Sequence, residues 1–172
     1  PVVDGGGAAA AARTATSVLN RDMTLSGLFK VLNPKGFLAD LKAEGVGIKT
    51  QDWVNVGAQG VIKARARAVG GKIRIEFFLY DTAKGTKPVL KKTYTGRKRG
   101  VRRLAHRFGN DVVEFYTGKK GIFLTKIAFA SGSRKSKRSQ IYVMDYDGYG
   151  VYKVSRTGRL NVLPAWSPRG AL

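Results

Sequence analysis

Hydrophobic and charged positions alternate along the middle of the chain, at about residues 60–69 and again at 72–80. A period of two is typical of strands that bury one face and expose the other. The Gly70-Gly71 pair separates the two segments, and two glycines between alternating segments indicate a tight hairpin turn. After a turn at residues 81–85, another strand is expected at about residues 89–95. The pattern therefore predicts three consecutive strands of one sheet.

Two longer segments have the period of α-helices. An Ala-rich run predicts a first helix at about residues 8–26, and the glycines before it are expected to form a flexible lead-in with no strand ahead of them. A second helix is expected from the basic run at residue 97 to Thr117. Its apolar positions recur at a spacing of three to four and form a buried stripe: Val101, Leu104, Ala105, Phe108, Val112 and Phe115 or Tyr116. His106 is the only histidine, and because it lies off this stripe it is expected to be exposed.

The segment between the first helix and the strands has weaker patterns. A short strand is expected at residues 28–32, a short amphipathic helix at 35–44, and one or two helical turns at 51–58 with Trp53 as their core anchor. These elements predict a two-layer domain of the α+β or α/β class over residues 1–117. In it, a mixed sheet is covered on one face by two main helices.

Residues 123–172 have a different pattern. Strands are expected at about residues 126–131, 140–145 and 151–154, with the start of a fourth near 164–166. Short strands separated by Asp-Gly and Ser-Pro-x-Gly turns, at just under 50 residues, are typical of one propeller blade. A single blade cannot bury its own faces. The chain is therefore expected to hold a domain at 1–117, a linker at 118–122 and the first, incomplete blade of a β-propeller at 123–172.

The charge of the chain is strongly positive, with 32 Lys and Arg against 11 Asp and Glu and a net charge of +21. The excess is concentrated after residue 60. Alternation places one basic group on the sheet face opposite the apolar residues, and a second group lies in the densest charge run. Together they form a candidate surface for an anionic partner: Arg65, Arg67, Lys72, Arg74, Arg97, Lys98, Arg99, Arg102 and Arg103. A solvated basic surface without a partner remains the alternative.

Nucleic acid is one possible anionic partner. A basic sheet face binds single strands when aromatic side chains share it, because bases stack on them. Phe77 is expected on the apolar face, so only Phe78 and Tyr80 remain for the basic one, and no Gly-Phe-x-Phe pattern is present. Nucleic acid is therefore an unlikely partner by this pattern, and anionic lipid or cell-wall polymer is the other interpretation.

The residues offer little to catalysis or to cofactors. There is no Cys, which excludes disulfides, thiolate metal sites and cysteine nucleophiles. His106 is the sole candidate base and no Gly-x-Ser-x-Gly sequence accompanies it. Asp145 and Asp147 belong to a turn, and Arg156 stands where a calcium-binding EF-hand loop would need Glu. The Gly5–Gly7 run lacks the Lys and the spacing of phosphate-binding loops. We predict no catalytic, cofactor or metal site, and find no signal peptide and no stretch of 18 apolar residues.

Several motifs in order resemble the TolB family of bacterial Tol-Pal systems. The join between the predicted domains, Thr-Gly-Lys-Lys-Gly-Ile-Phe-Leu-Thr-Lys-Ile-Ala-Phe at 117–129, is similar to the join between the two domains of that family. Asp-Tyr-Asp-Gly-Tyr at 145–149 and Pro-Ala-Trp-Ser-Pro-Arg-Gly at 164–170 are similar to its first propeller blade. Upstream, further likeness is found at 26–29 (Ser-Gly-Leu-Phe), 52–58 (Asp-Trp, then Val-Gly-Ala) and 101–106 (Val-Arg-Arg-Leu-Ala-His).

The resemblance implies a non-enzymatic periplasmic adaptor. Such a protein would bind the lipoprotein Pal through its propeller and TolA through an N-terminal extension, maintain outer-membrane integrity and aid outer-membrane constriction at division. The extension, a first strand and the later blades are expected to be missing from these 172 residues. Arg169 departs from the Asp that the family usually has in this turn, and the high charge departs as well. A basic nucleic-acid-binding domain is the alternative function.

Overall fold

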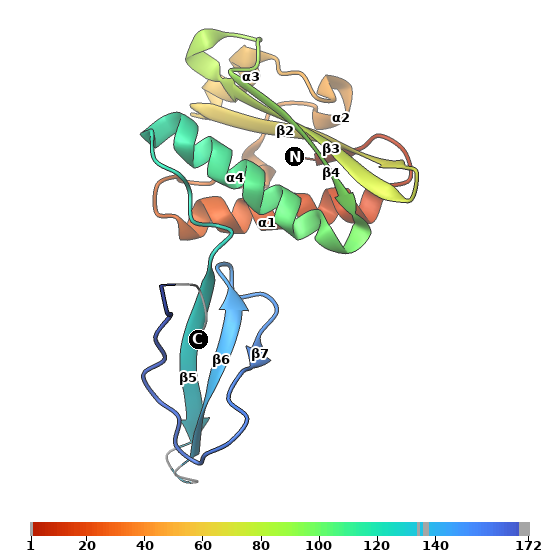
Figure 1. Cartoon of the computed structure of the whole chain (residues 1–172). Coiled ribbons are helices and arrows are strands. Elements are labelled where there is room, and N and C mark those ends of the chain that lie inside the picture. The colour runs from red at the N-terminus through yellow and green to blue at the C-terminus, as the bar shows by residue number, and fades with distance from the viewer. Residues whose placement is uncertain (1, 134, 136–137, 169–172) are drawn as a thin grey trace. The chain divides into compact units, whose positions relative to one another are not determined.

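The computed structural model describes residues 2–133, 135 and 138–168 (Figure 1). The chain divides into two compact units, Pro1–Gly121 and Ile122–Leu172. The division falls inside the segment that was predicted as a linker, residues 118–122. In the helices of the described residues, none is both long and apolar enough to cross a membrane.

The first unit is built on a four-stranded mixed sheet. Its strands are β1 (Val2–Asp4), β2 (Gly60–Val69), β3 (Lys72–Asp81) and β4 (Leu90–Arg97), in the order β1-β2-β3-β4. β1 runs parallel to β2, whereas β2, β3 and β4 are antiparallel neighbours. The predicted mixed sheet and its three consecutive strands are therefore confirmed, with β4 extending to Arg97.

The strand β1 corrects the prediction that no strand precedes the glycine run. Val2 pairs with Ala64, and the N–H of Gly5 continues the ladder by donating to the carbonyl of Ala66 at 2.7 Å. A Cβ on Gly5 would lie 2.7 Å from Cγ of Arg67, so the backbone and this side chain approach too closely for any larger residue. A three-residue strand is too short to show a period of two, which is why the pattern missed it.

Two long helices cover one face of this sheet, here called the inner face (Figure 1). They are α1 (Ala9–Leu25) and α4 (Val101–Thr117), as predicted, although α4 begins after a 3₁₀ turn at Lys98–Gly100. Phe77 stacks on Phe108 with ring centroids 4.6 Å apart, and both rings are fully buried. Small alanines on β2 and α1 let the layers approach, so the core combines the Phe77–Phe108 pair and aliphatic side chains of β3, α1 and α4 with alanines.

The opposite, outer face is covered over one half only. The segment that carries α2 (Leu41–Glu44) and α3 (Thr50–Asn55) lies on this side (Figure 1). Its second core centres on buried residues, which are Ile48, Trp53, Ala58, Val61 and Tyr80. Trp53 is therefore the anchor that the sequence predicts.

Two predictions for this segment are wrong. Residues 28–32 form no strand, and the predicted helix at 35–44 is a 3₁₀ turn, Pro34–Gly36, followed by the single turn of α2. The side chain of Asp40 accepts the N–H groups of Lys42 and Ala43 and so starts a new helix at that point. The apolar residues pack individually against the sheet, which produces no regular period.

A buried ion pair fastens this segment to the sheet. Nζ of Lys63 on β2 lies 2.6 Å from Oε2 of Glu44, and the two side chains are 0% and 2% exposed. Glu44 also accepts the amide of Lys49 at 2.6 Å and the indole N–H of Trp53 at 3.2 Å. Lys63 lies on the same side of the sheet as Arg65 and Arg67, yet the outer face is closed over it.

The second unit contains a three-stranded antiparallel sheet. Its strands are β5 (Lys126–Ser133), β6 (Arg138–Asp145) and β7 (Tyr152–Lys153), in that order. The expected start of a fourth strand at residues 164–166 is absent, although these residues are described. That this sheet is a propeller blade stays a prediction. Arg169, which departs from the family's turn sequence, lies outside the described residues.

Because removal of one partner leaves an uncompensated buried charge, we expect Glu44→Ala to lower the free energy of unfolding by about 3 kcal/mol. Urea denaturation at pH 7 measures this. Glu114→Ala, which removes an exposed carboxylate on α4, is the matched control and is expected to change it by less than about 0.5 kcal/mol. An equal effect of the two variants would contradict the role of the ion pair.

The same pair predicts a pH dependence. Burial alone would raise the pKa of Glu44, but the hydrogen bonds from Lys63, the Lys49 amide and Trp53, with the charge of Lys63, together hold that pKa below its usual range. The stabilisation is complete above the unfolded-state pKa of about 4.3 and is lost as the pH falls through the lower folded-state value. Glu44→Gln should remove this part of the acid-induced loss of stability.

Candidate functional site

Five of the nine predicted anion-binding residues lie together on the uncovered half of the outer face. We call this group the outer basic face: Arg65, Arg67, Lys72, Arg74 and Arg97. The strand register brings them into rows, because Arg67 pairs with Arg74 and Lys72 pairs with Arg97 across neighbouring strands. Paired positions of a sheet project to the same side. The predicted placement of Arg65, Arg67, Lys72 and Arg74 opposite the apolar face is therefore confirmed, and Arg97 joins them through its pairing with Lys72.

The other four predicted residues do not join this group. Lys98 and Arg99 lie in the 3₁₀ turn that follows β4, and Arg102 and Arg103 lie in the first turn of α4. Because α4 packs on the inner face, its side chains belong to the other layer. Lys98, Arg99 and Arg103 are exposed, whereas Arg102 is half-buried. The continuous charge run in the sequence is thus divided between two surfaces.

Few acidic side chains neutralise the positive charges of the outer basic face. Arg65 pairs in register with Glu76, and Oε1 of Glu76 lies 3.5 Å from the guanidinium of Arg74 with both side chains partly exposed. Exposed pairs of this kind contribute little to stability. Arg67 directly opposite Arg74 places like charges side by side, which is unfavourable without an anion between them. Such an arrangement can hold phosphate or carboxylate groups that approach from solvent.

The two aromatic residues that could have stacked on nucleic-acid bases, Tyr80 and Phe78, make other contacts in this structure. Tyr80 is 4% exposed, and its hydroxyl donates to the carbonyl of Val46 at 2.7 Å. Burial, followed by the nearby charge of Glu44, raises the pKa of Tyr80. Phe78 packs against the second core, and the ammonium of Lys91 lies 5.4 Å from its ring centroid. Neither ring is presented to a base on the outer basic face.

The glycine run before α1 holds a side chain of the protein itself. Oδ1 of Asp4 accepts the N–H of Gly6 at 2.9 Å and of Ala8 at 2.8 Å. These hydrogen bonds lower the pKa of Asp4. The carboxylate therefore occupies amides that a phosphate would need, and it holds the turn between β1 and α1.

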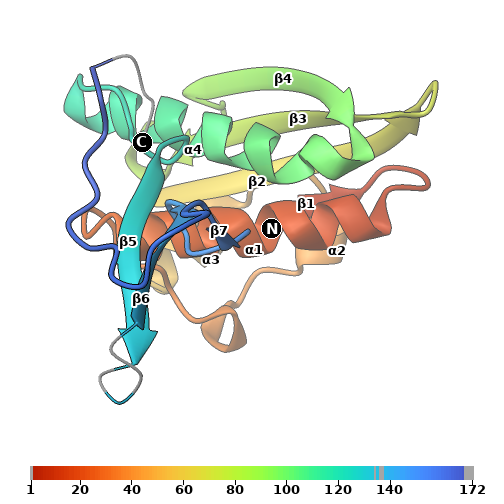
Figure 2. The same cartoon turned by 60° about the horizontal axis from the view of Figure 1, so that its bottom comes forward.

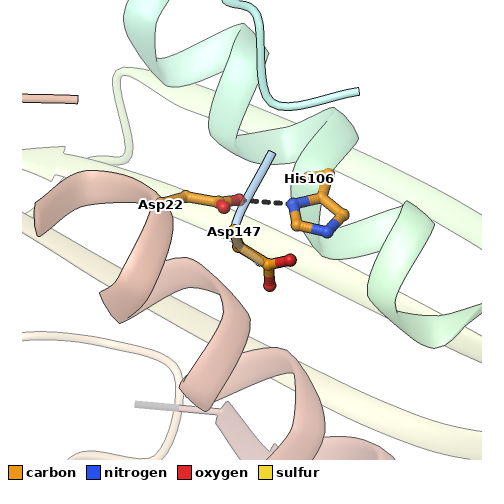
Figure 3. A group of neighbouring side chains, drawn as sticks. All are labelled: Asp22, His106 and Asp147. Atoms are coloured by element: carbon orange, nitrogen blue, oxygen red, sulfur yellow. Dashed lines mark hydrogen bonds and ion pairs between the residues drawn. The ribbon is translucent and has the colours of Figure 1, made fainter. Parts of the chain in front are cut away.

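A buried acid–base pair joins α1 and α4, which corrects the prediction that His106 is exposed. Nδ1 of His106 lies 2.7 Å from Oδ2 of Asp22, and the two residues are 4% and 0% exposed (Figure 3). The sequence of α1 contained an indication of this buried pair. Asp22 follows Ala15, Val18 and Leu19 at helical spacing and so lies on the buried stripe. An acidic residue on a buried stripe indicates a buried partner. Since the two helices are neighbours, the pair fixes their relative position.

We expect the Asp22–His106 pair to be coupled energetically. In a double-mutant cycle of Asp22→Asn and His106→Gln, the coupling free energy should be about 1 kcal/mol or more, because each partner compensates the buried polar atoms of the other. Chemical denaturation of the four proteins measures it. Asn20→Ala, an exposed change on α1, is the control. Additive effects of the two substitutions would show that the pair is not a stabilising contact.

Comparison with known proteins agrees with these observations. Residues 1–88 match the family model described as the TolB amino-terminal domain. The chain is 35% identical over 162 residues to the Tol-Pal system protein TolB of Geobacter sulfurreducens, covering 94% of this chain and 37% of that protein. It is 38% identical over 168 residues to that of Anaeromyxobacter dehalogenans, covering 96% and 38%.

A solved structure, TolB from Acinetobacter baumannii, superimposes with a TM-score of 0.71 at 18% identity over 88% of this chain and 36% of that one, which shows a shared fold. The chain thus spans about 37% of the length of the curated relatives it matches. The family match over half of the chain, supported by these relatives, shows that the chain belongs to the TolB family.

Proposed function

We propose that this chain is part of a non-enzymatic periplasmic adaptor of a Tol-Pal system, which binds Pal and TolA. The family match carries this proposal, because the relatives over most of the chain are Tol-Pal system proteins. In this role the protein maintains outer-membrane integrity and aids constriction of the outer membrane at cell division. Pal binding is assigned to a propeller and TolA binding to an N-terminal extension, and the domain of residues 1–117 connects the two.

The construction of the first unit suits a connecting role. Buried polar pairs hold its elements together: Glu44 with Lys63 ties the outer segment to the sheet, and Asp22 with His106 ties α1 to α4 within the inner layer. Buried pairs of this kind have defined geometry, and they resist sliding of the joined elements past one another. A rigid domain transmits a change at one end to the other without absorbing it.

The outer basic face is proposed as a second contact of the adaptor with the cell envelope. Anionic lipid and cell-wall polymer both present phosphate or carboxylate groups at high density, and five clustered cations attract such surfaces. A basic nucleic-acid-binding domain, the other function considered, gains no support from the family match, and the buried Tyr80 and packed Phe78 argue against base stacking.

A gene deletion tests the adaptor proposal. Removal of the gene that encodes this chain from its source bacterium should release periplasmic enzymes into the medium, sensitise the cells to detergent and produce chains of unseparated cells. Restoring the complete gene should reverse all three, and the complete product should retain purified Pal and TolA periplasmic domains in pull-down experiments. Intact barrier function and normal division in the deletion strain would refute the proposal.

A vesicle assay tests the outer basic face. The chain should co-sediment with vesicles that contain phosphatidylglycerol at low salt, and added salt should weaken this binding because the attraction is screened. Arg67→Glu combined with Arg74→Glu should reduce the bound fraction at least about threefold, since each reversal removes and opposes one surface charge. Arg13→Glu with Lys42→Glu, the same charge change at other exposed sites, is the control. Equal loss in both doubles would mean that only net charge matters.

A further inference from the structure

One edge of the sheet in the first unit ends on a long strand. β4 is the last strand in the order β1-β2-β3-β4, and it pairs with β3 along eight consecutive positions (Figure 2). Within residues 2–133, 135 and 138–168, no strand pairs with the other side of β4. Every second residue of an edge strand directs its N–H and C=O away from the sheet, and these groups form a template for another extended chain.

The residues along this edge are basic and contain no acid. Three of them carry positive charge, Lys91, Lys92 and Arg97, and all three are exposed. The remaining members of β4 are Leu90, Thr93, Tyr94, Thr95 and Gly96. These residues favour a strand, because they include β-branched and aromatic side chains and no proline.

The helix beneath β4 adds cations to the same edge. The guanidinium of Arg107 on α4 lies 4.6 Å from the ring centroid of Tyr94, and Arg107 is exposed. Arg103 is also exposed and lies one turn earlier on the same side of α4. An added strand would thus meet positive side chains on both of its faces, from Lys91 on one side and from α4 on the other.

The edge is held in place by its own packing. The hydroxyl of Tyr94 donates to Oδ2 of Asp111 on α4, and burial together with this hydrogen bond raises the pKa of Tyr94. Gly96 lies against the side chain of Leu104, where an added Cβ would be 3.4 Å from its methyl carbons. A partner strand would therefore meet a preformed edge and would not have to order it.

Charge selects the kind of strand that can occupy this edge. Lysines on an edge strand commonly prevent pairing between copies of the same protein, and two β4 edges would bring Lys91, Lys92 and Arg97 against the same residues. The net charge of +21 adds to this repulsion. A strand rich in Glu and Asp reverses the sign of the same interactions.

We infer that the β4 edge, flanked by Lys91, Lys92, Arg103 and Arg107, is a docking site for an extended acidic segment of a partner protein. The segment adds as a fifth strand. Its backbone pairs with β4, and its carboxylates contact the basic side chains on both faces. This site adjoins the outer basic face at Arg97, and the inference does not require that the partner be Pal or TolA.

A synthetic peptide tests both components of the inference. The probe is a fluorescent, amidated octapeptide in which pairs of Glu residues alternate with Thr-Val pairs, so that carboxylates project from both faces of the extended strand. Its binding to the full chain is followed by anisotropy. A second peptide carries N-methyl groups on alternate amides, which leaves one backbone edge free, and a third carries them on every amide. The first two should bind within about threefold of each other, while the third should bind at least about tenfold more weakly. Equal binding of all three would overturn the proposal, because their charges are identical.

Paired variants locate the site. Lys91→Glu with Lys92→Glu should weaken binding of the unmethylated peptide at least about tenfold, whereas Arg67→Glu with Arg74→Glu, an equal charge change on the outer basic face, should weaken it less than about threefold. Amide resonances of Leu90–Arg97 should shift in ¹⁵N spectra of the full chain on addition of the peptide. Loss of binding only in the Arg67/Arg74 variant would overturn the proposal.

A membrane surface is the competing occupant. If phosphatidylglycerol vesicles displaced the peptide, and the Lys91/Lys92 variant lost vesicle binding as well, the edge would be a lipid contact and the proposal would be wrong. Failure of the peptide experiments would leave the adaptor proposal standing, since that rests on the deletion phenotype and on purified partners. Conversely, a deletion strain without a phenotype would leave the peptide result unchanged.

Discussion

The buried contact between Lys63 and Glu44 determines what the sheet can present to solvent. Lys63 lies on β2 in the row of positions that continues to Arg65 and Arg67, so by alternation alone all three would be equivalent. They are not, because Glu44 and the ring of Trp53 enclose the first of them. The enclosing segment ends there, and beyond it the outer face is open. One ion pair therefore marks the border between a second core and a charged surface.

This division gives the two sides of the sheet different tasks. The inner face must pack against α1 and α4, and its strand residues do so with alanines, aliphatic side chains and the ring of Phe77. The open half of the outer face has no such requirement and can keep Arg67 opposite Arg74 at a cost in repulsion. Because this repulsion does not stabilise the fold, we infer that the like charges serve another purpose, such as binding. The proposed anionic contact provides such a use, and it requires no residue that the core depends on.

The regular elements of the fold could be predicted because their patterns are local. The three strands after residue 60 and the two long helices each carry a period that can be read within ten to twenty residues. What failed was the assumption that charged residues lie outside. Lys63 and His106 are both buried, and their partners Glu44 and Asp22 are 19 and 84 residues distant. A one-dimensional pattern does not reveal such pairs, although a charged residue on an apolar stripe, as at Asp22, is a usable warning.

The candidate surface shows the same limit in another form. The run from Arg97 to Arg103 is continuous in the sequence, yet the chain turns at Lys98–Gly100 and carries its second half to the opposite layer. Conversely, Lys92 and Arg107 are far apart in the sequence but flank one strand edge, because α4 packs beneath β4. Charge density along a chain thus indicates a candidate surface for an anion without predicting where that surface lies. The position of the proposed docking site depends on which strand lies at the edge of the sheet. An edge strand also requires its partner to be extended, which charge alone does not. A partner at β4 must be extended as well as acidic, so backbone geometry, rather than the total of +21, determines which anions are accepted there.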